Sequence, residues 1–127
     1  MEFSEPLKMN YDFRRAYRKG RSAAEPCLVV YARRNNSRRN RVGYTVSNKL
    51  GHAVVRNRIR RRLREIYRLN ESRFRAGFDI VVVARGRSVT ADYRRLERDF
   101  FRAASGLGLL KQPEAAAVPA AEEEEEV

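Results

Sequence analysis

The pattern of apolar and polar positions predicts a short helix near the start of the chain. Residues 10–19 fit a helical period, because Phe13 and Tyr17 lie four positions apart and so share one face. Asn10 or Asp12 is a candidate for the N-terminal cap, since either side chain can accept a hydrogen bond from a free backbone amide. The glycine that follows marks the expected end of the helix.

Two β-rich runs follow this helix. Residues 27–32 are mostly apolar, and residues 42–47 alternate between larger apolar and small or polar side chains. The strongly basic segment 33–41 separates them and is typical of a turn. We therefore expect the two runs to pair as a hairpin with one buried face.

A helical period returns over residues 53–69. Its apolar stripe consists of Val55, Ile59, Leu63 and Ile66. Residues 79–84 are a continuous apolar run, which is typical of a strand covered on both faces. A last helix is expected after Thr90, the candidate cap, and should close near Gly106 and Gly108.

The predicted order of elements is helix, strand, strand, helix, strand, helix. Such an order implies an α+β fold in which helices pack on a mixed sheet, an α/β sandwich. No internal repeat interrupts it.

Composition divides the chain into two parts. Residues 1–110 contain 27 Lys and Arg against 10 Asp and Glu, whereas residues 111–127 are mostly Ala, Pro and Glu. The second part has too little apolar surface to offset the entropy of ordering it. We therefore expect one folded domain over 1–110 and a disordered acidic tail over 111–127.

The charge of the folded part indicates a polyanionic partner. The whole chain carries +12 even with its acidic end included, and a compact body with such an excess repels itself. Arginine exceeds lysine by 24 to 4. The planar guanidinium binds phosphate in a bidentate manner, although a GC-rich genome would also favour arginine codons.

The rarity of cysteine and histidine excludes several kinds of site. Cys27 and His52 are the only residues of their types, which excludes an internal disulfide, a cysteine-based zinc site and a cluster of imidazoles. The carboxylates are too few and too scattered for a two-metal nuclease centre. We expect no catalytic residue, no metal site and no small-molecule substrate. Without a signal peptide or membrane span, we also expect a cytoplasmic protein.

The central helix carries the clearest sign of a binding surface. Seven of the 13 residues from 56 to 68 are arginine. On a helical wheel, the positions opposite the apolar stripe are Asn57, Arg61, Arg64 and Arg68; Arg60 flanks them, and Arg56, Arg58 and Arg62 border the core side. A merely solvated helix would mix charges to gain favourable pairs, so we interpret this face as a docking ridge for polyphosphate.

Residues 48–65 also form an ordered motif, Lys-x-Gly-x-Ala-Val-x-Arg-Asn running into the basic helix. The matching positions are Lys49, Gly51, Ala53, Val54, Arg56, Asn57, Arg61 and Arg64. This motif resembles the signature of the bacterial ribonuclease P protein family, and the similarity extends over about residues 7–108. Asn48 departs from the pattern, because the family often has a second lysine there, and the acidic tail has no counterpart in it.

The resemblance implies a protein that assists a catalytic RNA in removing the 5′ leader from precursor tRNA. The chain would be the non-catalytic subunit, and Mg²⁺ would be held mainly by the RNA. The implied fold is like that of domain 2 of ribosomal protein S5, with a left-handed βαβ crossover. The implied contacts to the catalytic RNA are Lys49, Arg56, Asn57, Arg58, Arg60, Arg61, Arg64 and Arg68.

The resemblance further implies that a cleft between the first helix and the sheet receives the single-stranded leader. Its expected residues are Phe13, Tyr17, Tyr31, Lys19, Arg21 and Ser22. Aromatic faces beside cations are a general means of holding single strands, although the three aromatic residues would also suit a core-facing role. A ribosomal or RNA-chaperone protein remains the main alternative function, and a nuclease that acts alone is a weaker one.

Overall fold

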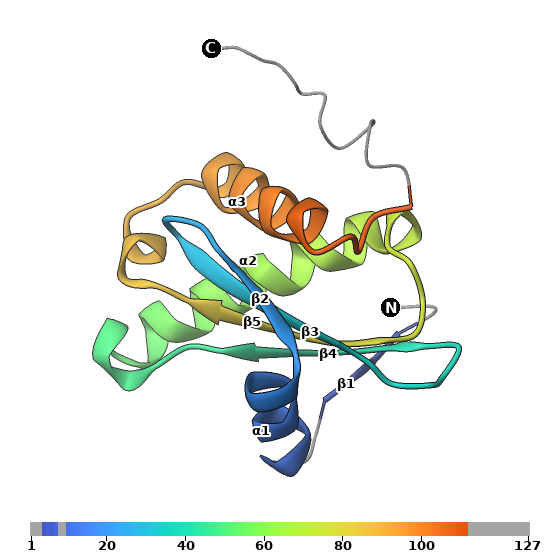
Figure 1. The fold of residues 1–127 in the computed structure, drawn as a ribbon. Coiled ribbons are helices and arrows are strands. Elements are labelled where there is room, and N and C mark those ends of the chain that lie inside the picture. The colour runs from blue at the N-terminus through green and yellow to red at the C-terminus, as the bar shows by residue number, and fades with distance from the viewer. Residues whose placement is uncertain (1–3, 8–9, 112–127) are drawn as a thin grey trace.

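The computed structural model describes residues 4–7 and 10–111, which form a mixed sheet with helices on both faces (Figure 1). The strands are β1 (Ser4–Pro6), β2 (Arg21–Ala24), β3 (Leu28–Arg34), β4 (Asn40–Thr45) and β5 (Phe78–Ala84). The helices are α1 (Asn10–Lys19), α2 (Ala53–Asn70) and α3 (Tyr93–Gly106). The α+β class and the order of the longer elements are confirmed.

The strand order is β1-β4-β5-β3-β2, and it shows that the predicted hairpin is wrong. β3 and β4 do not pair with each other, because β5 lies between them, antiparallel to β3 and parallel to β4. The reason is the composition of β5. Ile80, Val81 and Val82 are all fully buried, and a strand that is apolar on both faces gains most from the centre of a sheet.

The parallel pair β4 and β5 requires a crossover connection, which α2 supplies. The handedness of this crossover stays a prediction. The two edge strands were not predicted from the sequence. β1 and β2 have three and four residues, and their sequences, SEP and RSAA, lack the β-branched residues that mark a strand.

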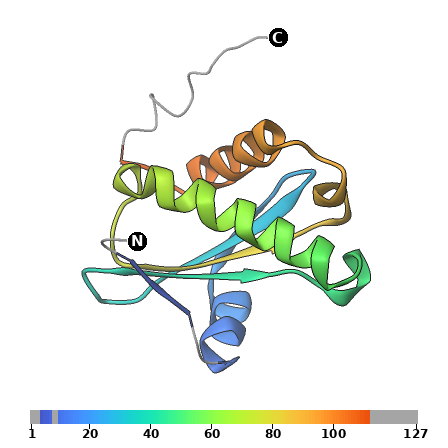
Figure 2. The ribbon, with the colours of Figure 1, turned by 180° about the vertical axis from the view of Figure 1, so that it is seen from behind.

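The helices cover the sheet unequally. α2 and α3 lie on one face and α1 on the other (Figures 1 and 2). The larger core joins alternate residues of the central strands to the apolar stripes of α2 and α3. A smaller core on the opposite face contains Leu7, Ala16 and Val81, with Phe13 and Tyr31 packed against it.

The helix ends differ in detail from the expectations. The apolar stripe of α2 is confirmed, since Ile59, Leu63 and Ile66 are buried. The cap of α3 is Asp92 rather than Thr90, because the Asp92 carboxylate accepts a hydrogen bond of 2.9 Å from the Arg95 amide. Asp12 lies inside α1, and its carboxylate binds Arg41.

The predicted tail falls almost wholly on residues 112–127, which lie outside the described residues. Within the described part, no helix combines the length and apolar character that a membrane crossing needs.

Candidate nucleic-acid interface

Four residues of α2 form an exposed ridge along its solvent side. This outer ridge consists of Asn57, Arg61, Arg64 and Arg68. The opposite side of the helix buries Ile59, Leu63, Ile66 and Tyr67, so the ridge is fixed to the core of the molecule. In Figure 2, α2 runs across the near face with its whole length open to one side. A rigid row of cations suits the fixed phosphates of a folded RNA.

The ridge arginines differ in their local partners. Arg68 donates to the Glu65 carboxylate at 2.8 Å, and this hydrogen bond lowers the pKa of Glu65. Among the described residues, Arg61 and Arg64 have no hydrogen-bond or ion-pair partner. Their guanidinium groups can therefore bind a ligand without first breaking a hydrogen bond or ion pair among the described residues.

The arginines that border the core side have contacts that are structural. Arg56 donates to the Gly51 carbonyl at 3.1 Å, and Arg62 donates to the Ala91 carbonyl at 3.2 Å. Arg58 reaches the Val89 carbonyl at 3.5 Å. These bonds attach the segments before α2 and before α3 to the basic helix. Arg56 and Arg58 therefore serve the fold whether or not they also contact RNA.

Two further members of the predicted set extend the ridge. Lys49 is exposed in the short helical turn η1 (Asn48–Leu50), which precedes α2. Gly51 joins η1 to α2. Its φ of +142° is a conformation that favours glycine, and a Cβ at this position would come within 3.2 Å of the Val55 side chain. Arg60 lies beside the ridge and donates to the Asn57 side chain at 3.1 Å.

A cleft of about 450 Å³ is lined by residues of α1, β4 and α2. This α1 cleft is lined by Asn10, Phe13, Arg14, Tyr17, Tyr44, Thr45, Val46 and Arg60. Arg60 belongs to α2, so the cleft opens directly beside the outer ridge. Two cations and three aromatic rings in one cleft match the requirements of a single-stranded nucleic acid.

The aromatic residues of the cleft are held in fixed positions. The Tyr17 hydroxyl makes a hydrogen bond of 2.9 Å with the Thr45 hydroxyl. The rings of Tyr17 and Tyr31 meet edge to face, with their centroids 4.9 Å apart. Tyr44 has a buried hydroxyl without a hydrogen-bond partner among the described residues, and burial raises its pKa.

The structure brings together only part of the predicted leader set. Phe13 and Tyr17 line the α1 cleft, and Tyr31 contacts Tyr17 from β3. Ser22 lies opposite Tyr31 on β2, on the same face of the sheet. Lys19 and Arg21 instead line a different pocket. Arg21 pairs with Ala32, so it projects to the face that carries α3.

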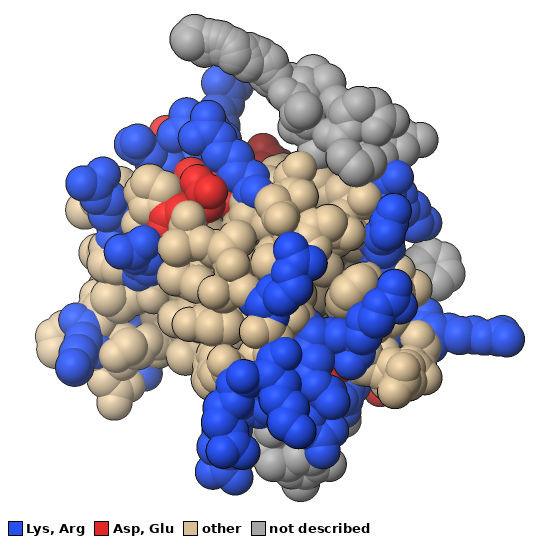
Figure 3. All heavy atoms as spheres, viewed as in Figure 1, with Lys and Arg blue, Asp and Glu red and all other residues tan. Residues whose placement is uncertain are grey.

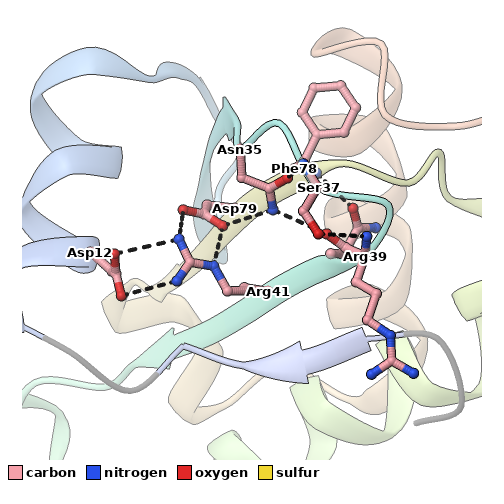
Figure 4. A network of polar contacts seen from close by, with 8 residues as sticks. Asp12, Asn35, Ser37, Arg39, Arg41, Phe78 and Asp79 are labelled. Carbon is pink, nitrogen blue, oxygen red and sulfur yellow. Dashed lines mark hydrogen bonds and ion pairs between the residues drawn. The ribbon is translucent and has the colours of Figure 1, made fainter.

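A buried ion-pair network fixes α1 to the sheet (Figure 4). Arg41 of β4 donates to both carboxylate oxygens of Asp79, at 2.8 and 2.7 Å, and to Asp12 of α1 at 3.2 Å. Asn35 also donates to Asp79 at 3.0 Å. The hydrogen bond to Asp79 raises the pKa of Arg41.

This network was missed in the sequence. The one available sign is Asp79 at the head of an otherwise apolar strand, because a carboxylate there needs a buried cation. Both aspartates are occupied by Arg41, so the network positions α1 and has no free acid or base to offer a reaction.

Metal ligands are not gathered anywhere in the described part of the chain. No group of three or more His, Cys, Asp or Glu side chains there could hold a metal ion. The cationic surfaces described above have the opposite chemistry, since they bind anions.

Comparison with known proteins places these features in a family. The family model "Ribonuclease P" matches residues 1–107. The ribonuclease P protein component of Alkaliphilus metalliredigens is 44% identical over 97 residues, covering 76% of this chain and 87% of the relative. That of Natranaerobius thermophilus is 42% identical over 106 residues, covering 84% of this chain and 92% of the relative.

Solved structures of such proteins have the same fold. The Staphylococcus aureus ribonuclease P protein superposes with a TM-score of 0.79 at 33% identity, covering 85% of this chain and 99% of its own. The Thermotoga maritima ribonuclease P protein superposes with a TM-score of 0.71 at 31% identity. The match covers 77% of this chain and 93% of the Thermotoga maritima chain.

Proposed function

The chain belongs to the ribonuclease P protein family, and from this premise we propose how its two surfaces divide the work of RNA binding. It is a protein component of ribonuclease P, the non-catalytic subunit of a ribonucleoprotein endonuclease that acts in tRNA processing. The outer ridge of α2 binds the catalytic RNA, and the α1 cleft binds the 5′ leader of precursor tRNA.

The observation that carries the proposal is the pair Arg61 and Arg64, which lack partners within the described residues and stand on a helix anchored to the core. Lys49, Asn57, Arg60 and Arg68 surround them and enlarge the same surface. Arg56 and Arg58 contribute at its border, where they also hold neighbouring segments in place. Such a surface binds a folded RNA mainly through its phosphates, without reading sequence.

The α1 cleft suits the leader because it lies beside the ridge and offers rings as well as charge. Stacking on Phe13 or Tyr17 is worth about 1–3 kcal/mol per base and tolerates any base. Tyr31 and Ser22 would extend this surface along the sheet. A leader of any sequence could then be held next to the catalytic RNA.

Mg²⁺ takes part through the RNA in this proposal. The ion prefers oxygen ligands and retains several waters, so RNA phosphates are suitable partners for it. The protein contributes indirectly, because its arginines reduce the repulsion between two RNA molecules. The catalytic reaction should therefore need less Mg²⁺ when the protein is present.

The test is multiple-turnover cleavage of a precursor tRNA at low Mg²⁺ by a bacterial ribonuclease P RNA, with and without the protein. We expect strong stimulation that Arg61→Ala/Arg64→Ala abolishes. Arg94→Ala/Arg98→Ala is the matched control, because it removes the same charge from exposed positions on α3.

Two outcomes would contradict the proposal. If tight RNA binding is accompanied by no stimulation, a structural RNA-binding role would replace it. If both double variants lose stimulation equally, net charge rather than the α2 ridge would be responsible.

A further inference from the structure

A second basic pocket lies between the sheet and the C-terminal end of α3, and Lys19 at the end of α1 contributes to its lining. This β2–α3 pocket has a volume of about 440 Å³ and is lined by Lys19, Arg21, Arg33, Arg34, Arg75 and Phe78, among others. Basic side chains gather over α1 and the adjoining strand ends on the face shown in Figure 3. None of the residues that line the pocket belongs to α2, so the pocket is separate from the outer ridge.

The strand register places the main groups of the pocket on one side of the sheet. Arg21 pairs with Ala32, and Arg34 pairs with Phe78, two residues further along β3. The Arg34 guanidinium lies over the Phe78 ring, 5.5 Å from its centroid. The pocket thus has an apolar floor and an aromatic ring, with cations around its rim.

No acidic residue lines this pocket, although five cations do. Their mutual repulsion is unfavourable unless an anion is bound there. A combination of an aromatic face, a guanidinium plane and several cations fits a nucleotide of a single strand, because the base can stack while the phosphates are neutralised.

A continuous route connects the α1 cleft to this pocket. Tyr17 contacts Tyr31, Tyr31 pairs with Ser22 on the edge strand β2, and Arg21 is the next residue of that strand. Since β2 is the last strand of the sheet, a chain that passes over Ser22 reaches the opposite face at Arg21. Lys19 lies just beyond Tyr17 in α1 and lines the pocket as well.

We infer that the β2–α3 pocket binds single-stranded RNA, namely the leader nucleotides that lie farther from the cleavage site than those held in the α1 cleft. This inference rests on the proposed function of the cleft. It predicts that long leaders gain affinity from a surface that short leaders never reach.

The test compares two precursor tRNAs, one with a long leader and one whose leader is trimmed to the few nucleotides beside the cleavage site. Binding to the assembled protein–RNA enzyme is measured over a range of salt concentrations, with Ca²⁺ in place of Mg²⁺ to slow cleavage. The variant is Arg21→Ala/Arg34→Ala/Arg75→Ala. The control is Arg94→Ala/Arg95→Ala/Arg98→Ala, which removes equal charge from a separate pocket at the start of α3.

We expect the pocket variant to bind the long-leader precursor about tenfold more weakly, with the short-leader precursor unaffected. The slope of log affinity against log salt should fall by about 2 for the long leader, because each single-strand phosphate contact contributes about 0.7. The control variant should bind both precursors as the parent does.

The inference would be overturned by an equal loss on both precursors, by no loss, or by the same loss in the control. Tighter binding of the long leader by the pocket variant would also overturn it, since the arginines would then be holding the acidic residues 112–127 instead. Failure of the parent protein to support cleavage of the short-leader precursor would count against the proposed function itself, so the two failures are distinguishable.

Discussion

Arg41 shows how strongly one side chain can constrain the position of a binding element. Its guanidinium is shared by two buried carboxylates, one on β5 and one on α1. A buried charge is tolerated only when it is paired. Removal of Arg41 would therefore leave two buried carboxylates without their cation, which destabilises the folded state. The position of α1, and with it the shape of the α1 cleft, therefore depends on a residue that does not line the cleft.

Arg41→Ala should lower the free energy of unfolding by about 3 kcal/mol, the lower end of the range for breaking a buried pair, because Arg41 itself is one-third exposed. Arg39→Ala is the control. Arg39 forms an ion pair with Glu5 at 3.8 Å, and both side chains are about half exposed. Loss of this pair should lower the free energy of unfolding by at most about 1 kcal/mol. Urea unfolding measures both, and similar losses would show that the network adds no stability.

Cys27 predicts a pH effect on stability. Burial and the nearby Asp99 carboxylate raise the pKa of its thiol from 9.0 to about 11. The folded chain thus holds the thiol proton more tightly than the unfolded chain does. The thiol therefore contributes to the free energy of unfolding. This contribution is complete below pH 9.0 and is lost as the pH rises toward about 11.

The measurement is urea unfolding of the parent and of Cys27→Ala across this alkaline window. The variant lacks the titrating thiol, so the difference in stability between the two proteins should narrow as the pH rises. A constant difference would mean that the thiol has the same pKa in both states.

Among the elements, α1 depends on close contact with the sheet. Gly43 of β4 permits this approach, because a Cβ at that position would lie 2.5 Å from the Phe13 ring. Phe13 in turn lines the α1 cleft. A side chain at position 43 would push α1 away and open the cleft.

Gly43→Ala should therefore cost about 1–3 kcal/mol of stability, as overpacking does. It should also weaken leader binding while leaving the affinity for the catalytic RNA unchanged. Gly86→Ala is the control, since nothing lies within 4 Å of a Cβ there. Calorimetric unfolding together with binding of leader and RNA tests this, and equal loss of both affinities would contradict it.

The elements also show what the sequence could and could not predict. The α2 stripe and the continuous apolar run of β5 were predictable, because hydrophobic period depends only on nearby residues. The pairing of β3 with β5 was not predictable. The sequence favoured a hairpin of β3 with β4, because these two strands are neighbours along the chain. The Arg41–Asp79 pair was missed for the same reason, as its partners are 38 residues apart.

For the candidate interface, the helical wheel of α2 was sufficient to identify the outer ridge. The leader set was less predictable. Lys19 and Arg21 follow Tyr17 closely in sequence, but strand β2 begins at Arg21 and alternation sends its side chain to the other face. Without knowing that β2 exists, no sequence argument separates Arg21 from Ser22.

At the scale of the whole molecule, charge should dominate the affinity for the catalytic RNA. Arg61→Ala/Arg64→Ala should reduce the slope of log affinity against log salt by about 2, since each duplex phosphate contact contributes about 0.9. Arg94→Ala/Arg98→Ala should leave the slope unchanged. A filter-binding titration measures this, and equal slopes for parent and ridge variant would exclude phosphate contacts by these arginines.

The acidic end of the sequence suggests a second effect of charge. Residues 112–127 contain six glutamates and no cation, so they can compete with RNA for the arginines of the same chain. Deleting these residues should tighten non-specific RNA binding at low salt, and the gain should vanish at high salt. Unchanged binding of an unrelated RNA at low salt would remove this idea.

The position of β5 also governs how the chain acquires its shape. β3 and β4 are complete by residue 45, but the strand that joins them is not complete until residue 84. A nascent chain emerging from the ribosome would therefore expose the unpaired edges of β3 and β4 until β5 is made. During this interval the ribosome synthesises α2, the most basic segment. The contacts that close the sheet span long stretches of chain, which favours slow folding. The cationic surface is thus translated before the sheet can close, so newly made chains should gain protection from aggregation by binding nearby RNA early.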